Sequence, residues 1–361
     1  MKKILLLMMI FVCGNAVLHA MPLMEIQKLA ENGDPYYQAT LGGEYRRGEA
    51  IKKDYNLALE WLKKAEKQQH PFAYYHLAAM YRLGTGVPQD KSKAVEYYQK
   101  AYTGMLALAK KGDLEAQTNL GWMYAHCSCV GRHFQQAHKW YHQAADQGYR
   151  RAQSNLGDMY FQGDGVSLDY AEAFKWYLKA AEQGYSSAQV KVGMMYEKGL
   201  GVKTQESEAV RWYRRAAENG NPQAQTNLAL MYQAGCGVEK DEREAFKWNE
   251  KAAEQGHSQA QTNLGIMYQY GCGTEADPKK AIQWYTAAAE AGYVEAQVKL
   301  ALIYENGYGL LKNEAKAIEW YRRAVSPFLE TKLEHPLAKA SSPEDFKQEI
   351  PIDITEDEGF F

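Results

Sequence analysis

A 36-residue pattern that returns along most of this 361-residue chain limits its possible folds more than any other feature. The dipeptide Ala-Gln recurs at an unbroken spacing of 36, beginning at Ala116, Ala152, Ala188, Ala224, Ala260 and Ala296. A period of this size is typical of stacked helical hairpins. The sequence therefore predicts an array of repeats, each of which needs neighbours to cover its apolar flanks.

One repeat, residues 152–187, shows how the hairpin is specified. From Ala152, apolar residues follow at i+4, i+7 and i+8, which is one stripe of a first helix. Gly163 opens a glycine-containing turn. A second helix carries Trp176 on its apolar face and is predicted to end at Gly184, because glycine most easily adopts a left-handed helix end.

The second helix of each repeat is predicted to begin at a polar side chain that caps its free amide groups. In the repeat above, Asp169 is followed three residues later by Glu172, a spacing that predicts a capping box. The equivalent cap residues are Asp54, Asp90, Asp169, Asp241, Asp277 and Asn313, with His133 and Gln205 as departures. The tryptophan column within the second helices, at Trp140, Trp176, Trp212, Trp248, Trp284 and Trp320, is interpreted as core.

These patterns divide the chain into a signal peptide, a capping helix, eight repeats and a tail. The predicted ranges are 1–20 for the signal peptide, 21–36 for the N-terminal capping helix, 37–72, 73–115, 116–151, 152–187, 188–223, 224–259, 260–295 and 296–325 for the repeats, and 326–361 for the tail. The second repeat is seven residues longer than the others, near Thr103 to Ala109. Since seven residues are about two helical turns, one long second helix is expected there.

The consensus AxxxLGxMYxxGxGVxxDxxKAxxWYxKAAxxG resembles the Sel1-like repeat family, a relative of the tetratricopeptide solenoids, over about residues 22–325. The resemblance implies an all-α fold, a right-handed α/α superhelical solenoid with the first helices on the concave side. It also implies a non-catalytic scaffold or adaptor that binds a protein or peptide. A cysteine-rich subgroup of the family is linked to β-lactam binding and weak β-lactamase activity, which is the alternative function. That subgroup carries a cysteine pair in each repeat, and this chain does not.

The first twenty residues have the character of a secretory signal. Lys2 and Lys3 precede an apolar run from Ile4 to Val12, and Ala20 provides a small residue before a cleavage point. The run is too short to span a bilayer. Cys13 suggests a lipoprotein, but Val12 before it fits such signals poorly. The protein is expected in the periplasm, secreted or at the surface of a bacterium, without membrane insertion. There it is expected to engage envelope or host proteins and to be associated with virulence.

The tail differs from the repeats in composition and charge. Residues 326–361 contain three Lys against nine Asp and Glu and four prolines. With the whole chain at −2, no concentrated basic face is present, which argues against a nucleic-acid partner. The tail is predicted to be largely disordered.

The cysteines invite a metal or disulfide interpretation, chiefly in the third repeat. Cys127 and Cys129 replace its turn glycines, and His126 and His133 flank them. Thiolate and imidazole suit zinc or copper, but the Cys-x-Cys spacing is shorter than in structural zinc sites, so a local disulfide or inert loop is favoured and no metal or cofactor is expected. Cys236 and Cys272 lie one repeat apart, too far to be paired with each other.

Enzyme signatures are missing from the sequence. It has no Ser followed three positions later by Lys, no Gly-x-Ser-x-Gly elbow and no phosphate-binding loop. The recurring Gly-x-Gly is interpreted as the turn between the two helices of each repeat. The prediction is a protein that is not an enzyme.

A binding surface is expected along the first helices. One column of these helices varies in identity while the core columns do not, and an asparagine column runs beside it. The candidate residues are Asn119, Trp122, Asn155, Asp158, Met194, Asn227, Leu230, Asn263 and Ile266. Such side chains contact peptides in related grooves, but they also satisfy neighbouring helices and loops. Both interpretations stay open from the sequence alone.

Overall fold

The computed structural model describes residues 22–48 and 51–329, with side chains up to Ser326, and the regular structure of these residues is entirely helical. The predicted signal peptide and residues 330–361 of the predicted tail lie outside the described residues. No helix in the described ranges is long and apolar enough to cross a membrane.

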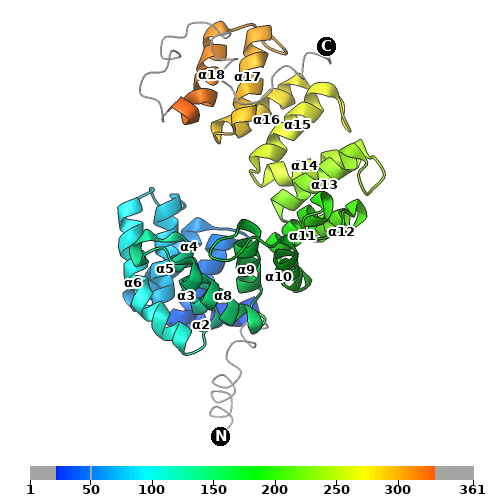
Figure 1. The fold of residues 1–361 in the computed structure, drawn as a ribbon. Helices are drawn as coiled ribbons and strands as arrows, with labels where there is room; N and C mark the ends of the chain where they lie inside the picture. The colour runs from blue at the N-terminus through cyan, green and yellow to red at the C-terminus, as the bar shows by residue number, and fades with distance from the viewer. Residues whose placement is uncertain (1–21, 49–50, 330–361) are drawn as a thin grey trace. The chain divides into compact units, whose positions relative to one another are not determined.

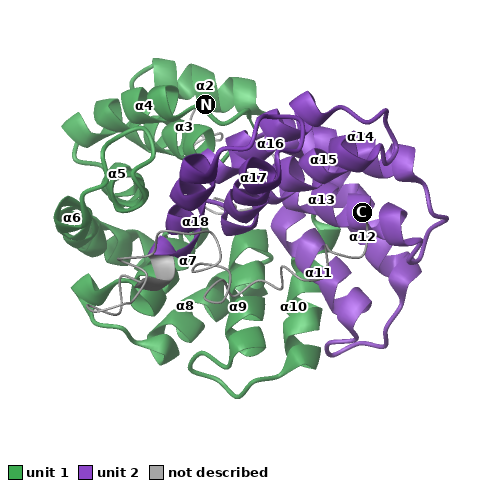
Figure 2. Ribbon diagram, turned by 90° about the horizontal axis from the view of Figure 1, so that it is seen from above, with its two compact units in different colours: residues 1–183 green, residues 184–361 purple. Residues whose placement is uncertain are grey.

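The chain divides into two compact units, residues 1–183 (unit 1) and 184–361 (unit 2), which Figure 2 distinguishes by colour. Unit 1 contains α2 (Leu23–Glu31), α3 (Pro35–Arg47), α4 (Tyr55–Lys67), α5 (Pro71–Leu83), α6 (Lys91–Lys110), α7 (Leu114–His126), the 3₁₀ turn η2 (Ser128–Val130), α8 (Phe134–Asp146), α9 (Arg150–Gln162) and α10 (Tyr170–Glu182). Unit 2 contains α11 (Ser186–Lys198), α12 (Glu206–Glu218), α13 (Pro222–Ala234), α14 (Glu242–Glu254), α15 (Ser258–Tyr270), α16 (Pro278–Glu290), α17 (Val294–Asn306) and α18 (Glu314–Leu329).

After the leading α2, the helices form pairs that pack as hairpins. We call the first member of each pair helix A (α3, α5, α7, α9, α11, α13, α15 and α17) and the second helix B (α4, α6, α8, α10, α12, α14, α16 and α18). Within each unit, helices that follow one another in the chain lie side by side (Figure 1). The all-α, solenoid-like fold predicted from the 36-residue period is therefore confirmed.

The long second repeat is accommodated as the sequence predicts. Helix α6 has 20 residues, whereas α4 before it and α8 after it have 13 each. Because seven residues make about two turns, the additional length returns the apolar face to the same side of the helix. At the other end of the array, α18 continues to Leu329, three residues beyond Ser326, where the tail was predicted to begin.

The predicted caps of the B helices are present. The side chain of Asp169 accepts a hydrogen bond from the Glu172 amide, and the other five predicted caps do the same for their helices. The two departures, His133 and Gln205, form no side-chain cap. The capping box also predicts a hydrogen bond from the Asp169 N–H back to the Glu172 carboxylate. This part of the prediction is wrong, because the Glu172 carboxylate pairs with Lys175 instead.

The amide that Glu172 was expected to satisfy has a backbone partner. In all eight hairpins the N–H of the cap residue donates to the carbonyl of a helix A tyrosine, at 2.8 to 3.0 Å. The donor and acceptor pairs include Asp54 with Tyr45, Asp169 with Tyr160, and Asp277 with Tyr268. This bond fixes where helix B starts relative to helix A.

The Ala-Gln dipeptide that revealed the period joins successive repeats. Its alanine is completely buried at each of the six positions. The glutamine amide donates to the carbonyl of an alanine near the end of the preceding helix B, at 3.1 to 3.2 Å, from Gln117, Gln153, Gln225, Gln261 and Gln297. Each of these carbonyls also accepts from the backbone N–H of the glycine three residues further on, so the glutamine adds a second donor from the next repeat.

The tryptophan column is less buried than predicted. Trp176 and Trp212 are buried, but the other tryptophans of the B helices are only half-buried. The largest fully buried side chains are the neighbouring tyrosines, among them Tyr177, Tyr213 and Tyr285. A glycine of helix A faces each of these rings, and a Cβ at Gly157 would lie 2.6 Å from Tyr177. The close approach of the two helices therefore centres on tyrosine.

Candidate functional site

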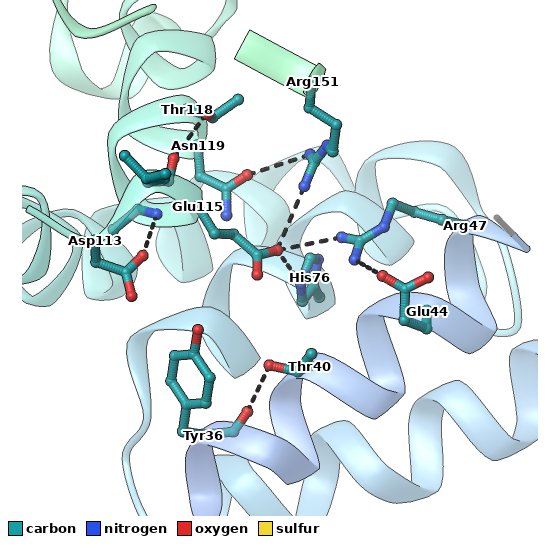
Figure 3. A network of polar contacts seen from close by, with 12 residues as sticks. Tyr36, Thr40, Glu44, Arg47, His76, Asp113, Glu115, Thr118, Asn119 and Arg151 are labelled. Carbon is teal, nitrogen blue, oxygen red and sulfur yellow. Dashed lines mark hydrogen bonds and ion pairs between the residues drawn. The ribbon is translucent and has the colours of Figure 1, made fainter. Parts of the chain in front are cut away.

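The A helices of unit 1 bring charged residues together in one half-buried cluster (Figure 3). We define the polar cluster as Glu44, Arg46 and Arg47 of α3, His76 of α5, Glu115 and Asn119 of α7, and Arg151 of α9. Its members come from four successive hairpins. The stacking of A helices at a fixed spacing is what places residues so distant in the sequence next to one another.

Glu115 is the centre of the polar cluster. Its Oε1 lies 3.4 Å from Nη1 of Arg47 and 3.4 Å from Nη1 of Arg151. Figure 3 shows both guanidinium groups pointing toward this carboxylate. The three side chains are only 9% to 16% exposed, so these ion pairs are weakly screened by solvent. The carboxylate of Glu115 thus pairs with Arg47 of α3, which lies before α5 in the array, and with Arg151 of α9, which lies after it.

The remaining carboxylate of the polar cluster, Glu44, pairs with Arg47 within the last turn of α3. Burial alone would raise the pKa of Glu44, but the charge and hydrogen bond of Arg47 outweigh it and lower the pKa. Arg46, which precedes Arg47 in the chain, forms no ion pair among the described residues. Its Nε is shielded from solvent and has no hydrogen-bond acceptor. Burial and the neighbouring charge of Arg47 lower the Arg46 pKa to about 10.

His76 lies inside the polar cluster as a neutral side chain. It is completely buried, and neither ring nitrogen has a hydrogen-bond partner. Its Nε2 is 3.9 Å from Oε1 of Glu115. Burial, followed by the charges of Arg46 and Arg47, holds its pKa well below the ordinary value. Gly43 makes room for the ring, since a Cβ there would lie 2.5 Å from Nε2.

Two of the sequence-predicted binding residues adjoin the polar cluster. Asn119 belongs to it and accepts a hydrogen bond from Arg151 at 3.4 Å, but it is completely buried and is placed to orient that arginine. Trp122 is half-buried beside the aromatic rings of Tyr75 and Tyr98, with the guanidinium of Arg82 5.1 Å from its centroid. Trp122 is therefore the exposed aromatic edge of this region.

Asn155 and Asp158 of α9 line a cavity of about 80 Å³. Asp158 also accepts the Tyr177 hydroxyl hydrogen bond at 2.5 Å. A cavity of this size has room for ordered water.

The two predicted asparagines of unit 2 have partners within their own helix or in the preceding hairpin. Asn227 accepts from Gln223 at 2.9 Å, and Asn263 donates to Asn249 at 3.4 Å. Met194 and Ile266 are half-buried, whereas Leu230 is 39% exposed. No charged network comparable to the polar cluster links Asn227, Leu230 and Asn263.

The third repeat does not present thiolates for a metal. Cys127 and Cys129 form a disulfide, as the favoured local-disulfide interpretation predicts. His126 contacts the Trp122 ring, and His133 precedes α8. No group of three potential metal ligands occurs among the residues that the structure describes. In unit 2, Cys236 and Cys272 are not bonded to each other, as the spacing predicts.

Sequence reasoning missed the arginines, Glu115 and His76. A signal was present, because the equivalents of Glu115 and Arg151 in later repeats include Ser187, Gln223 and Gln259. A position that is charged in two adjacent repeats and neutral in the next three marks a local specialisation, and the charge returns only at Glu295 in the last repeat. What the pattern did not reveal is that Arg47 reaches past α5 to α7.

The comparisons with known proteins agree with the architecture. The sequence model described as Sel1 repeat matches residues 35–70, 71–104, 114–149, 150–185, 186–221, 222–257, 258–293 and 294–326. No curated protein matches this chain at a significant level.

Two solved structures are similar over most of the chain. A protective antigen present in uropathogenic Escherichia coli strains, with an SLR fold, is 35% identical, with a TM-score of 0.55 over 91% of this chain and 71% of its own. A Sel1 repeat protein from Oxalobacter formigenes is 28% identical, with a TM-score of 0.56 over 84% of this chain and 87% of its own.

Proposed function

Because this chain belongs to the Sel1 repeat family, we propose that it is a non-catalytic scaffold that binds a protein or peptide along its A helices. One observation carries this proposal. The columns that join the hairpins keep their residue types, including the buried Ala-Gln pairs and the tyrosine carbonyl bonds, while the adjacent helix A columns change from repeat to repeat. Side chains that vary beside columns of fixed residue type are expected where a helix face recognises a partner.

The B helices offer less to a partner. Several of their tryptophans carry a cation from the same helix over the ring, as in Lys64 over Trp61 at 3.9 Å, Lys179 over Trp176 at 3.8 Å and Lys251 over Trp248 at 4.0 Å. These contacts already cover apolar rings that would otherwise anchor a partner. On the A helices, Leu230 is 39% exposed, and the half-buried Trp122 has the Arg82 guanidinium at 5.1 Å, farther from its ring than these lysines.

We further propose that the protein is exported and that its partner is an envelope or host protein. The basic and apolar N-terminal sequence supports export. A disulfide between Cys127 and Cys129 is compatible with an oxidising compartment. The similar Escherichia coli protein is described as a protective antigen, which supports a place accessible to the host.

Affinity capture with cross-linking and mass spectrometry identifies the partner, and matched variants then test the face. Asn155→Ala with Asn227→Ala should weaken partner binding about tenfold or more, if each amide contributes a typical net hydrogen bond. The control pair, Lys139→Ala with Gln283→Ala, lies on exposed helix B positions and should bind as the unmodified protein does. The proposal fails if the helix B pair alone weakens binding while both proteins melt normally. Turnover of a chromogenic cephalosporin would contradict the non-catalytic assignment.

A further inference from the structure

At the helix A position of Arg46, the first two repeats carry arginine (Arg46 and Arg82), whereas several later repeats carry a hydrogen-bond acceptor. At the same helix A position, Glu197, Gln269 and Glu305 accept a hydrogen bond from the hydroxyl of a helix B tyrosine. The acceptor at this position therefore has a structural role in those hairpins.

The first hairpin has lost that tyrosine. Leu62 occupies its place and packs against Gly42, so no hydroxyl remains for the Arg46 position to satisfy. No acceptor is therefore needed at this position in the first hairpin.

The guanidinium of Arg46 forms no ion pair among the described residues. Its Nε is shielded and has no hydrogen-bond partner, and the Nδ2 of Asn119 in the same cluster is in the same state. Glu115 is shared by Arg47 and Arg151, and Glu44 is paired with Arg47. Arg46 as a whole is only half-buried, so a group from solvent can reach its Nη groups, although not the shielded Nε. An unpaired guanidinium end is suited to a carboxylate, which accepts from the two Nη groups side by side.

We propose that Arg46 binds a carboxylate group of the peptide or protein partner. This inference rests on the proposed function, since it names the chemistry that the helix A face of unit 1 recognises. A carboxylate fits better than a phosphate, because Arg46 is one unpaired positive charge and a carboxylate carries one negative charge. The carboxylate comes either from an Asp or Glu side chain or from a chain end.

The test observes Arg46 directly through the NMR signal of its Nε–Hε group in the full-length protein. Four blocked peptides serve as probes: Ac-Ala-Glu-Ala-amide, Ac-Ala-Ala-Ala with a free carboxyl end, Ac-Ala-Gln-Ala-amide, and Ac-Ala-phosphoserine-Ala-amide. A carboxylate peptide should shift the Arg46 signal saturably, and the glutamine peptide should bind at least about tenfold more weakly. Which of the two carboxylate peptides binds more tightly identifies the source of the group.

Variants separate recognition from general electrostatics. Arg46→Gln should abolish saturable carboxylate binding, whereas Lys139→Gln, which removes an exposed positive charge from helix B, should leave it unchanged. Equal binding of the glutamine peptide, tighter binding of the phosphopeptide, or no saturable shift at Arg46 would overturn the inference. If the Asn155 and Asn227 variants weaken partner binding but Arg46→Gln does not, the proposed function stands and only the carboxylate assignment fails.

Discussion

The A helices of the two units share a scaffold and differ in the chemistry of one face. In unit 1, the positions of Glu115 and Arg151 carry charges that are paired across three hairpins. In unit 2, the equivalent Gln223 is exposed and bonds only Asn227 of its own helix. Yet both units use the same glutamine to join repeats and the same tyrosine carbonyl to start helix B. Within each repeat, some residues thus maintain the packing of the helices, whereas others differ in chemistry from one repeat to the next.

The largest expected effect on stability comes from a substitution that disrupts only the charged face of unit 1. Glu115→Ala should lower the free energy of unfolding by about 2 to 3 kcal/mol, because it leaves Arg47 and Arg151 without their shared, mostly buried carboxylate. Gln223→Ala, at the equivalent exposed position of unit 2, should change it by less than about 0.5 kcal/mol. Chemical denaturation followed by circular dichroism measures both. Equal losses would mean that the two faces do not differ energetically.

The next prediction concerns the part that the units share. Gln117→Ala in unit 1 and Gln261→Ala in unit 2 should each cost about 1 kcal/mol, because a hydrogen bond between repeats is lost while the alanine carbonyl keeps its backbone donor. Since repeat arrays are stabilised by intrinsic and nearest-neighbour terms, the two losses should be similar. A loss in only one unit, measured by the same denaturation, would refute a common scaffold.

The pH dependence of stability should reveal the buried histidine. Burial holds the pKa of His76 well below 6.5, so the unfolded chain binds a proton below pH 6.5 that the native protein does not. Stability should therefore fall as the pH drops below 6.5, by at most about 1.4 kcal/mol per pH unit for this group.

Two neighbouring groups modify this fall. His70, whose pKa burial lowers to about 4, adds to it between pH 6.5 and 4, while Asp113, whose pKa burial raises to about 6, opposes it between pH 6 and 3.8. His76→Leu should flatten the dependence of melting temperature on pH, and His257→Leu, at a half-buried position of unit 2, should do so less. An unchanged profile for His76→Leu would contradict a neutral buried His76.

The smallest expected effect is a gain in stability, and it is expected in both units. His133→Asp in unit 1 and Gln205→Asp in unit 2 would supply the missing caps of α8 and α12. Each should raise the free energy of unfolding by about 0.5 to 1 kcal/mol, because the new carboxylate accepts from a free helix amide. Thermal melts at neutral pH detect the change. A gain at only one of the two sites would show that the hairpin starts are not equivalent.

Most of the fold was readable from the sequence because a period constrains every copy at once. The hairpin ends, the five aspartate caps and the long α6 followed from spacing and residue type alone. The polar cluster did not, since an Arg47 to Glu115 contact spans 68 positions and depends on how three hairpins stack. The exposed face of the tryptophan column was also missed, because composition does not show which of two adjacent aromatic residues faces the core.

The central claim, that the A helices bind the partner, is tested most directly with a photoreactive phenylalanine analogue at two tryptophans of one repeat. Trp122 lies on helix A and Trp140 on helix B, and both are half-buried, so the two replacements are matched in size and exposure. With the captured partner present, illumination should cross-link it to the variant substituted at Trp122 and leave the variant substituted at Trp140 free. Cross-linking at Trp140 and not at Trp122 would contradict the account.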